Sequence, residues 1–250
     1  MFRYPKAGEN NSSIELYLVD TETKLKKKVR FGDENPYYIP RIKFGGGTTS
    51  LIIQTLNRHQ NHLKLWRWDT ASESLTLLLE EQNETYVSVH DNLKFLDDHS
   101  FLWTSERDGY NHIYHYNENG KLIRQLTQGE WEVTSVYVLN PKLKELYYQS
   151  VEGGSTERRV YSIKLNGKGK RLMQGTKGTN GASFSSNGRY YIHSFSNEVT
   201  PPRYSIYQTK SNSLLSSLLD NENLKDKIEE FGFSDRVFSS LSINGEALNM

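Results

Sequence analysis

Histidine side chains are the first candidates for chemistry in this sequence, and two pairs of them lie three residues apart. His59 and His62 form one pair, and His112 and His115 form the other. Side chains alternate between the two faces of a strand, so residues three apart point in opposite directions, and the second pair cannot hold one ion. The first pair falls in a predicted hairpin turn with no carboxylate beside it in the sequence. We therefore predict polar turn residues, and no metal site or cofactor.

The sequence offers few activated nucleophiles. No serine occupies a Gly-x-Ser-x-Gly pattern, the strained turn that exposes the nucleophile of α/β-hydrolases. Cysteine is absent, which excludes a thiolate nucleophile, a disulfide and a cysteine-ligated metal. Glu106 and Asp108 bring together two carboxylates that could act as acid and base, but Asp108-Gly109 is a turn dipeptide between two predicted strands. We predict no catalytic residue within this chain.

The balance of charge and hydropathy excludes two classes of partner. The 31 Lys and Arg and the 30 Asp and Glu leave a formal charge of +1. Because binding to phosphate backbones needs an excess of cations, we expect no nucleic-acid partner. The mean hydropathy is -0.72, and no long apolar run is present, so we expect no membrane span.

The elements that must position these residues recur with a period. Short apolar runs are separated by turn residues, and the second run of each group begins near Leu51, Phe101, Leu146 and Tyr190, in steps of 50, 45 and 44 residues. Four strands in about 40–50 residues is the spacing of a β-propeller blade. Within the runs, apolar and polar residues alternate as in strands, for example in residues 160–165. Hairpin dipeptides agree: Asn119-Gly120, Asn166-Gly167 and Asn187-Gly188.

The sequence therefore predicts an all-β chain that forms part of a propeller, in one domain over residues 1–250. We expect four full four-stranded blades and a partial one, with a short helix near the C-terminus. The predicted segments are a partial blade at 1–31, full blades at 38–80, 93–127, 133–174 and 182–219, and a helix and strand at 220–250.

Several segments resemble the N-terminal propeller of the dipeptidyl peptidase IV family, in particular its bacterial branch. Residues 4–10 read Tyr-Pro-Lys-Ala-Gly-Glu-Asn and are similar to the family's Y-P-K-A-G-x-x-N. Residues 38–42, 56–61, 103–114 and 125–133 carry further similar motifs in the same order. The resemblance implies an eight-bladed propeller followed by an α/β-hydrolase domain. Such enzymes are serine peptidases that remove X-Pro or X-Ala dipeptides from peptide N-termini.

The resemblance also implies where the chemistry lies. The family's Glu pair that holds the substrate amine precedes residues 4–10, and its Ser–Asp–His triad follows residue 250, so the chain alone is expected to be inactive. Glu80 and Glu81 match no family motif. The resemblance loosely places Tyr86, His90 and Asp91 at the substrate cavity. It further implies a linked hydrolase domain, a peptide substrate, a possible homodimer and a periplasmic or cell-envelope location for the full-length protein.

Two other functions are compatible with a propeller. The chain could be a stand-alone scaffold for protein partners. It could also bind carbohydrate, with Trp103 and Trp131 as stacking platforms, although core packing is the simpler interpretation of both rings.

Overall fold

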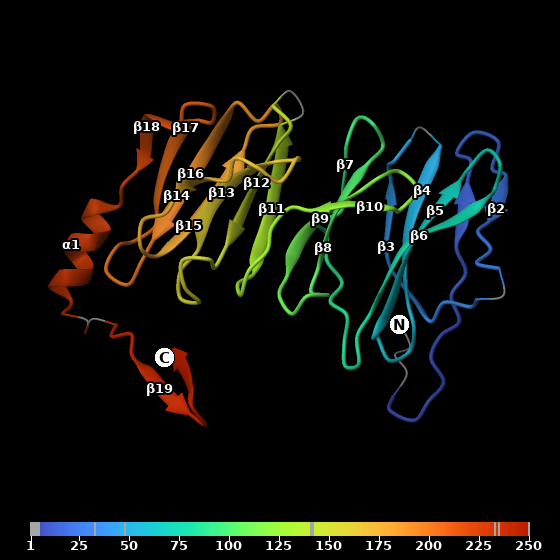
Figure 1. The fold of residues 1–250 in the computed structure, drawn as a ribbon, viewed down its shortest axis with the longest axis horizontal. Helices are drawn as coiled ribbons and strands as arrows, with labels where there is room; N and C mark the ends of the chain where they lie inside the picture. Colours follow the sequence, from blue (N-terminus) through green and yellow to red (C-terminus); the bar gives the residue numbers. More distant parts are fainter. Residues whose placement is uncertain are drawn as a thin grey trace. The chain divides into compact units, whose positions relative to one another are not determined.

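The computed structural model describes residues 6–32, 34–47, 49–140, 143–232, 234 and 236–249, with the Leu139 side chain excepted. It contains four four-stranded sheets, two two-stranded hairpins and one helix (Figure 1). The strands of each sheet pair with their sequence neighbours in a simple meander. This finding confirms the all-β prediction of propeller-type blades in series.

An N-terminal two-stranded hairpin precedes the first two four-stranded sheets. The hairpin consists of β1 (Tyr17–Val19) and β2 (Lys26–Lys28). The next sheet contains β3 (Tyr38–Phe44), β4 (Ser50–Leu56), β5 (His62–Asp69) and β6 (Leu75–Gln82). The second four-stranded sheet contains β7 (Lys94–Phe95), β8 (Phe101–Ser105), β9 (His112–Tyr116) and β10 (Leu122–Gln125).

The remaining elements lie toward the C-terminus. One sheet contains β11 (Val133–Asn140), β12 (Glu145–Ser150), β13 (Arg159–Lys164) and β14 (Arg171–Gln174). The last contains β15 (Thr179–Phe184), β16 (Tyr190–Ser196), β17 (Arg203–Gln208) and β18 (Ser213–Leu219). Helix α1 (Glu222–Glu230) and a hairpin of β19 (Ser240–Ile243) and β20 (Glu246–Asn249) follow. Asn221 precedes α1 in a left-handed backbone conformation, and its side chain forms no cap; its amide donates instead to the carbonyl of Pro202 at 2.6 Å.

The chain divides into two compact units. The first unit contains residues 1–102 and 116–122, and the second contains residues 103–115 and 123–250. In the first unit, Leu51 and Ile53 of β4 pack with Trp66 and Trp68 of β5 in a buried cluster. The Trp66 indole donates to the Thr55 hydroxyl at 2.9 Å, so this ring is buried with its polar atom satisfied. Alternation along β5 therefore places one row of apolar side chains in the core.

In the second unit, aromatic rings join the β11–β14 sheet to the β15–β18 sheet. Phe184 of β15 stacks on Tyr147 of β12 with ring centroids 4.7 Å apart, and on Tyr191 of β16 at 5.1 Å. Tyr207 continues the stack beyond Tyr191 at 5.2 Å. Burial raises the pKa of Tyr191 to about 12, so the hydroxyl stays protonated and donates to Asn212 at 2.5 Å. These rings form the core between the two sheets.

Truncation of Tyr191 tests this packing. We expect Tyr191→Ala to lower the free energy of unfolding by about 3–5 kcal/mol, because it removes a fully buried ring that touches two others. Urea denaturation followed by circular dichroism measures the change. Tyr204→Ala, which removes an exposed ring from β17, is the matched control. Equal losses in the two variants would contradict the role of the stack.

His193 gives this unit a predictable pH dependence. The side chain is 8% exposed, its Nε2 donates to Oδ1 of Asn180 at 3.0 Å, and the Tyr207 ring lies edge-on to it. Burial lowers the pKa of His193 to about 4 from an ordinary value of 6.5. The stability contribution is therefore present above pH 6.5. It is lost as the pH falls from 6.5 toward 4, because the unfolded chain takes up the proton first.

We expect His193→Gln to flatten the decline in unfolding free energy between pH 7 and pH 5. The decline attributable to this group approaches about 1.4 kcal/mol per pH unit only below pH 6, and it sums to about 2 kcal/mol between pH 7 and pH 5. Urea titrations at both pH values measure it. His59→Gln, at an exposed position, is expected to keep the decline of the native chain. If both variants show the same decline in unfolding free energy as the native chain, burial of His193 is not the cause of that decline.

Candidate functional site

The connection from β6 to β7 carries Tyr86, His90 and Asp91, the three residues expected from the sequence at a substrate cavity. The Asn83 amide donates to the carbonyl of Asn61 at 3.0 Å, and the Val87 amide donates to that of Gln60 at 2.9 Å. Asn83 also accepts hydrogen bonds from the backbone and hydroxyl of Thr85, which forms a local turn. The start of the segment is thus attached to the turn between β4 and β5.

An ion pair attaches the far end of the segment to β3. The Arg41 guanidinium donates through Nε to Oδ1 of Asp91 at 2.6 Å and through Nη2 to Oδ2 at 3.3 Å. The hydrogen bond from Arg41 lowers the pKa of Asp91, so the carboxylate stays ionised. Both side chains are exposed, and such pairs add little to global stability. The pair therefore positions the segment and presents a carboxylate to solvent.

This ion pair borders a small cavity of about 160 Å³ in the first unit. Its lining residues are Arg41, Ile42, Lys43, Ile52, Gln54, Asp91 and Leu93. Gln54 lies opposite Arg41 across the β3–β4 pair, so both side chains project from the same face of the sheet. Lys43 spans the cavity edge and donates to the carbonyl of Leu93 at 3.2 Å. The cavity is smaller than most ligand sites and would take a few atoms of a larger molecule.

The buried end of this cavity offers an unused acceptor. Gln54 is 4% exposed, and its Oε1 has no hydrogen-bond partner among the described residues. A buried carbonyl without a partner is costly, which makes it a natural acceptor for a donor from a ligand. Among the described residues, the lining contains neither serine nor histidine. Its chemistry is therefore binding by charge and hydrogen bonds, not nucleophilic attack.

Only one of the three predicted site residues lines this cavity. Asp91 does, whereas the Tyr86 side chain is 51% exposed and lies outside the lining. His90 also lies outside it, and its Nδ1 accepts from the Asn92 amide at 3.3 Å. Contact of any of the three with a substrate stays a prediction. Sequence analysis missed Gln54, although a polar residue inside the apolar run of β4 was a usable signal.

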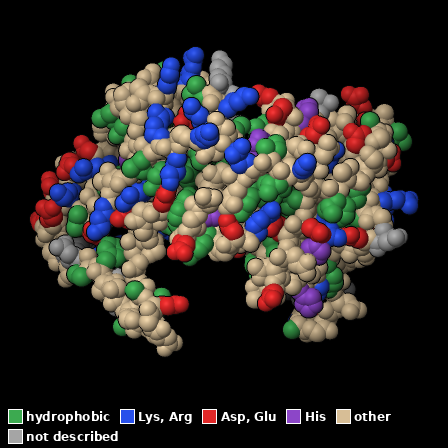
Figure 2. Space-filling model, in the orientation of Figure 1, with side chains coloured by type: hydrophobic (Ala, Val, Ile, Leu, Met, Phe, Trp, Pro, Cys, Tyr) green, Lys and Arg blue, Asp and Glu red, His purple; other side chains and the backbone are tan. Residues whose placement is uncertain are grey.

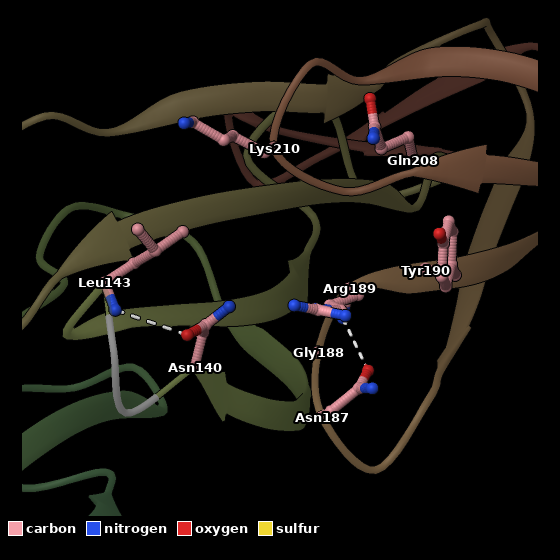
Figure 3. A pocket seen from close by; sticks show the side chains of 8 residues that line it. All are labelled: Asn140, Leu143, Asn187, Gly188, Arg189, Tyr190, Gln208 and Lys210. Carbon is pink, nitrogen blue, oxygen red and sulfur yellow. Dashed lines mark hydrogen bonds between the residues drawn. The ribbon is translucent and has the colours of Figure 1, made fainter.

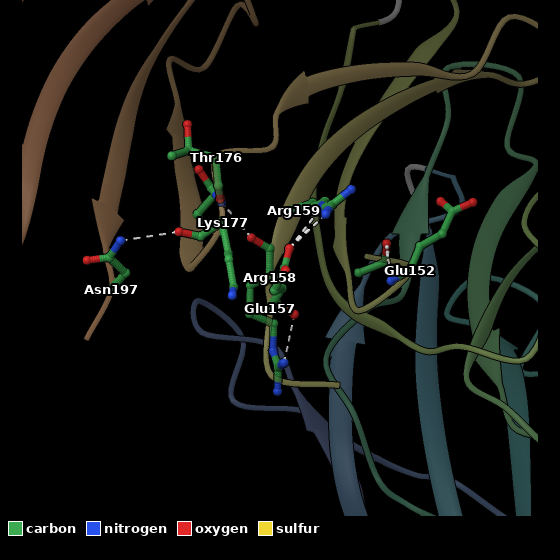
Figure 4. A network of polar contacts seen from close by, with 9 residues as sticks. Glu152, Glu157, Arg158, Arg159, Thr176, Lys177 and Asn197 are labelled. Atoms are coloured by element: carbon green, nitrogen blue, oxygen red, sulfur yellow. Dashed lines mark hydrogen bonds and ion pairs between the residues drawn. The ribbon is translucent and has the colours of Figure 1, made fainter. Parts of the chain in front are cut away.

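The second unit gathers polar contacts at one end of its sheets (Figure 4). The connection before β13 carries Glu157, whose carboxylate accepts from Arg159 through Nε at 3.0 Å and Nη2 at 2.8 Å. Asn180 donates through its amide to the carbonyl of Arg158 at 2.8 Å and to that of Thr176 at 2.6 Å. These contacts hold the β12–β13 and β14–β15 connections together, so the network is structural.

Other candidates from the sequence have structural explanations. His62 was expected to lack a carboxylate, but β5 pairs with β6 and brings its Nε2 within 3.0 Å of the Glu80 carboxylate. Trp103 is 1% exposed and cannot serve as a stacking platform, which corrects that part of the carbohydrate hypothesis. The Trp131 ring contacts the edge of His112 and lies beneath Lys170. The described residues contain no group of three or more side chains suited to a metal ion.

Comparisons with known proteins decide the family. The family model of the dipeptidyl peptidase IV N-terminal region matches residues 1–202. The chain belongs to this family. The crystal structure of Porphyromonas gingivalis dipeptidyl peptidase 4 is 34% identical in sequence and has a TM-score of 0.90, over 99% of this chain and 35% of that one. The match confirms the resemblance and identifies the sheets as propeller blades of the dipeptidyl peptidase 4 type.

Further relatives agree on the family and on the extent of the match. A putative dipeptidyl aminopeptidase IV from Bacteroides ovatus is 26% identical with a TM-score of 0.76, over 88% of this chain and 34% of that structure. A probable dipeptidyl peptidase 4 from Aspergillus flavus is 26% identical over 99% of this chain and 34% of its own length. The chain thus spans about a third of the dipeptidyl peptidases that it matches. Among the described residues, no helix is long and apolar enough to cross a membrane.

Loss of the Arg41–Asp91 ion pair should loosen the β6–β7 connection of this propeller segment. We expect Asp91→Asn to speed hydrogen exchange of backbone amides in residues 83–93, while the global unfolding midpoint stays the same because the pair is exposed. Mass spectrometry of exchanged peptides measures the effect. Glu84→Gln removes an equal charge from the same segment and should leave exchange unchanged. Unchanged exchange in Asp91→Asn would show that the ion pair does not hold the segment.

Proposed function

We propose that this chain is the non-catalytic propeller part of a serine exopeptidase and that it gates and shapes the cavity for a peptide substrate. The exopeptidase removes X-Pro or X-Ala dipeptides from peptide N-termini, and an α/β-hydrolase domain of the same polypeptide supplies the nucleophile. Membership of the dipeptidyl peptidase IV N-terminal region family supports the proposal. So does the length of the relatives, which is about three times the matched part.

One structural observation carries the gating role. The cavity bordered by Asp91 offers acceptors and cations but no serine or histidine in its lining, which suits a surface that orients a peptide without cleaving it. The unpartnered Oε1 of Gln54 can accept a peptide N–H, and the ionised Asp91 can accept an N–H or an ammonium group. Binding of this kind contributes to positioning of substrate and hence to KM.

Gln54→Leu in the whole protein tests this role. The whole protein should release Gly-Pro from Gly-Pro-p-nitroanilide and from a longer peptide that begins with Gly-Pro, and a serine-directed inhibitor should abolish both activities. We expect Gln54→Leu to raise KM for the longer peptide by about fivefold, because a hydrogen bond of about 1 kcal/mol is lost. The unfolding midpoint should not fall, since an unpartnered buried acceptor is removed as well.

Gln82→Leu, at an exposed position at the end of β6, is the control and should leave both KM and the midpoint unchanged. An unaltered KM in Gln54→Leu would reject a role of this cavity in substrate binding. Absence of inhibitor-sensitive release from either substrate by the native whole protein would reject the peptidase assignment itself.

A further inference from the structure

An open cavity of about 640 Å³ lies at the turns of the last two four-stranded sheets (Figure 3). It is lined by Asn140 and Leu143 from the β11–β12 turn, Asn187, Gly188, Arg189 and Tyr190 from the β15–β16 turn, and Gln208 and Lys210 from the β17–β18 turn. In a meander of antiparallel strands, these turns leave the sheets at the end opposite to the contacts of Figure 4. The cavity is therefore separate from that network, and its volume is typical of small-molecule sites.

The turns at this end of the second unit carry an excess of positive charge. The described residues of 140–145, 164–171, 185–190 and 208–213 include seven Lys and Arg, of which Lys170 is paired with Glu152, and a single acid, Glu145. Glu145 already accepts from the Tyr147 hydroxyl at 2.7 Å and lies 3.6 Å from Arg171. Figure 2 shows Lys and Arg side chains along this edge. The resulting positive potential attracts anions.

Two cations of the cavity lining are uncompensated. Arg189 and Lys210 are exposed, and within the described part of the chain neither side chain takes part in an ion pair or hydrogen bond. Exposed cations are common, so charge alone would not define a site. Here both line one concave surface, which distinguishes them from cations on a convex face.

Backbone hydrogen bonds fix the positions of these two residues. The Arg189 amide donates to Oδ1 of Asn187 at 3.0 Å, and its carbonyl accepts from the Thr209 amide at 2.9 Å. The Lys210 carbonyl accepts from Nη1 of Arg171 at 3.1 Å. The turn that carries Arg189 is thus tied directly to the turn that carries Lys210. The two backbones are therefore held in place, whereas the rotamers of the two exposed side chains would become ordered on binding.

Neutral donors face the same space. Asn140 is 8% exposed, and its Oδ1 accepts from the Leu143 amide at 3.2 Å, which leaves its amide Nδ2 to point toward Arg189 (Figure 3). Gly188 has φ +64°, a left-handed conformation that favours glycine in this turn. Gln208 accepts from the Ser211 hydroxyl through Oε1 at 2.7 Å and retains its own amide donors.

We propose that this cavity binds a small organic anion that carries hydroxyl groups, such as a sugar acid. Arg189 and Lys210 hold the carboxylate, which an arginine can engage through two N–H groups. The amides of Asn140 and Gln208 donate to the hydroxyl oxygens. The half-exposed ring of Tyr190 covers the apolar face of the ligand. This site lies outside the cavity of the proposed peptidase function and does not depend on it.

Calorimetric titration of the 250-residue chain with D-galacturonate tests the proposal. D-galactose, which lacks only the carboxylate, and inorganic phosphate, which lacks the hydroxylated ring, are the matched probes. We expect galacturonate to bind and galactose to bind at least about tenfold more weakly, because galactose lacks the charge-assisted hydrogen bond. Phosphate should also bind more weakly than galacturonate, because it lacks the ring and the hydroxyl groups that Tyr190, Asn140 and Gln208 are proposed to contact. Arg189→Gln and Lys210→Gln should each weaken galacturonate binding by about tenfold.

Lys168→Gln removes an equal charge from the same end of the unit but outside the lining, and should leave binding unchanged. Resonances of the Arg189 guanidinium in the native chain should shift when galacturonate is added, a measurement that needs no variant. No binding by the native chain, equal binding of galactose, or an equal loss in Lys168→Gln would overturn the proposal. Equal binding of phosphate would overturn the part assigned to the hydroxyl groups.

Discussion

The packing of one sheet against the next is the constraint on which the rest of this structure depends. A four-stranded meander has two faces and cannot cover its own apolar side chains, so neighbouring sheets must supply the second half of each core. In the second unit, Phe184 meets this requirement by stacking between Tyr147 on one sheet and Tyr191 on the next. The apolar residues of these two sheets pack in such contacts, and the polar groups that line the larger cavity lie at the turns and strand ends.

The period of the sequence could be read because this constraint repeats in every sheet. Each sheet needs the same alternation and the same turns, and Asn187-Gly188 does form the β15–β16 turn with a positive φ at the glycine. The ends of the chain were harder to delimit. Within the predicted partial blade of residues 1–31, β1 and β2 have only three residues each, because a two-stranded hairpin fixes fewer residues than a larger sheet.

The candidate site could be predicted only in part, for a physical reason. A resemblance points to Asp91, but its partner Arg41 lies 50 residues earlier on β3, and no local pattern encodes such a contact. A register shift between Tyr38 and Arg41 sets the place at which Arg41 faces Gln54. The same kind of pairing brought the Glu80 carboxylate to His62. Local patterns thus predict strands and turns, whereas the polar neighbours of a side chain follow from pairing across the sheet.

The two cavities differ in whether their cationic side chains are paired with a carboxylate. In the first cavity, Asp91 pairs with Arg41, and this ion pair holds the β6–β7 connection in place. The groups that can still accept a hydrogen bond from a ligand are the remaining lone pairs of the Asp91 carboxylate and the side-chain carbonyl of Gln54. Arg189 and Lys210 lack such a partner, while their backbones are held as firmly. The first arrangement favours a neutral or cationic donor, and the second favours an anion. Both cavities contain arginine and lysine, but they favour ligands of opposite charge. In the first cavity the Arg41 side chain is bound by a carboxylate, whereas in the second the hydrogen bonds hold the backbones of Arg189 and Lys210 and leave their charged groups available.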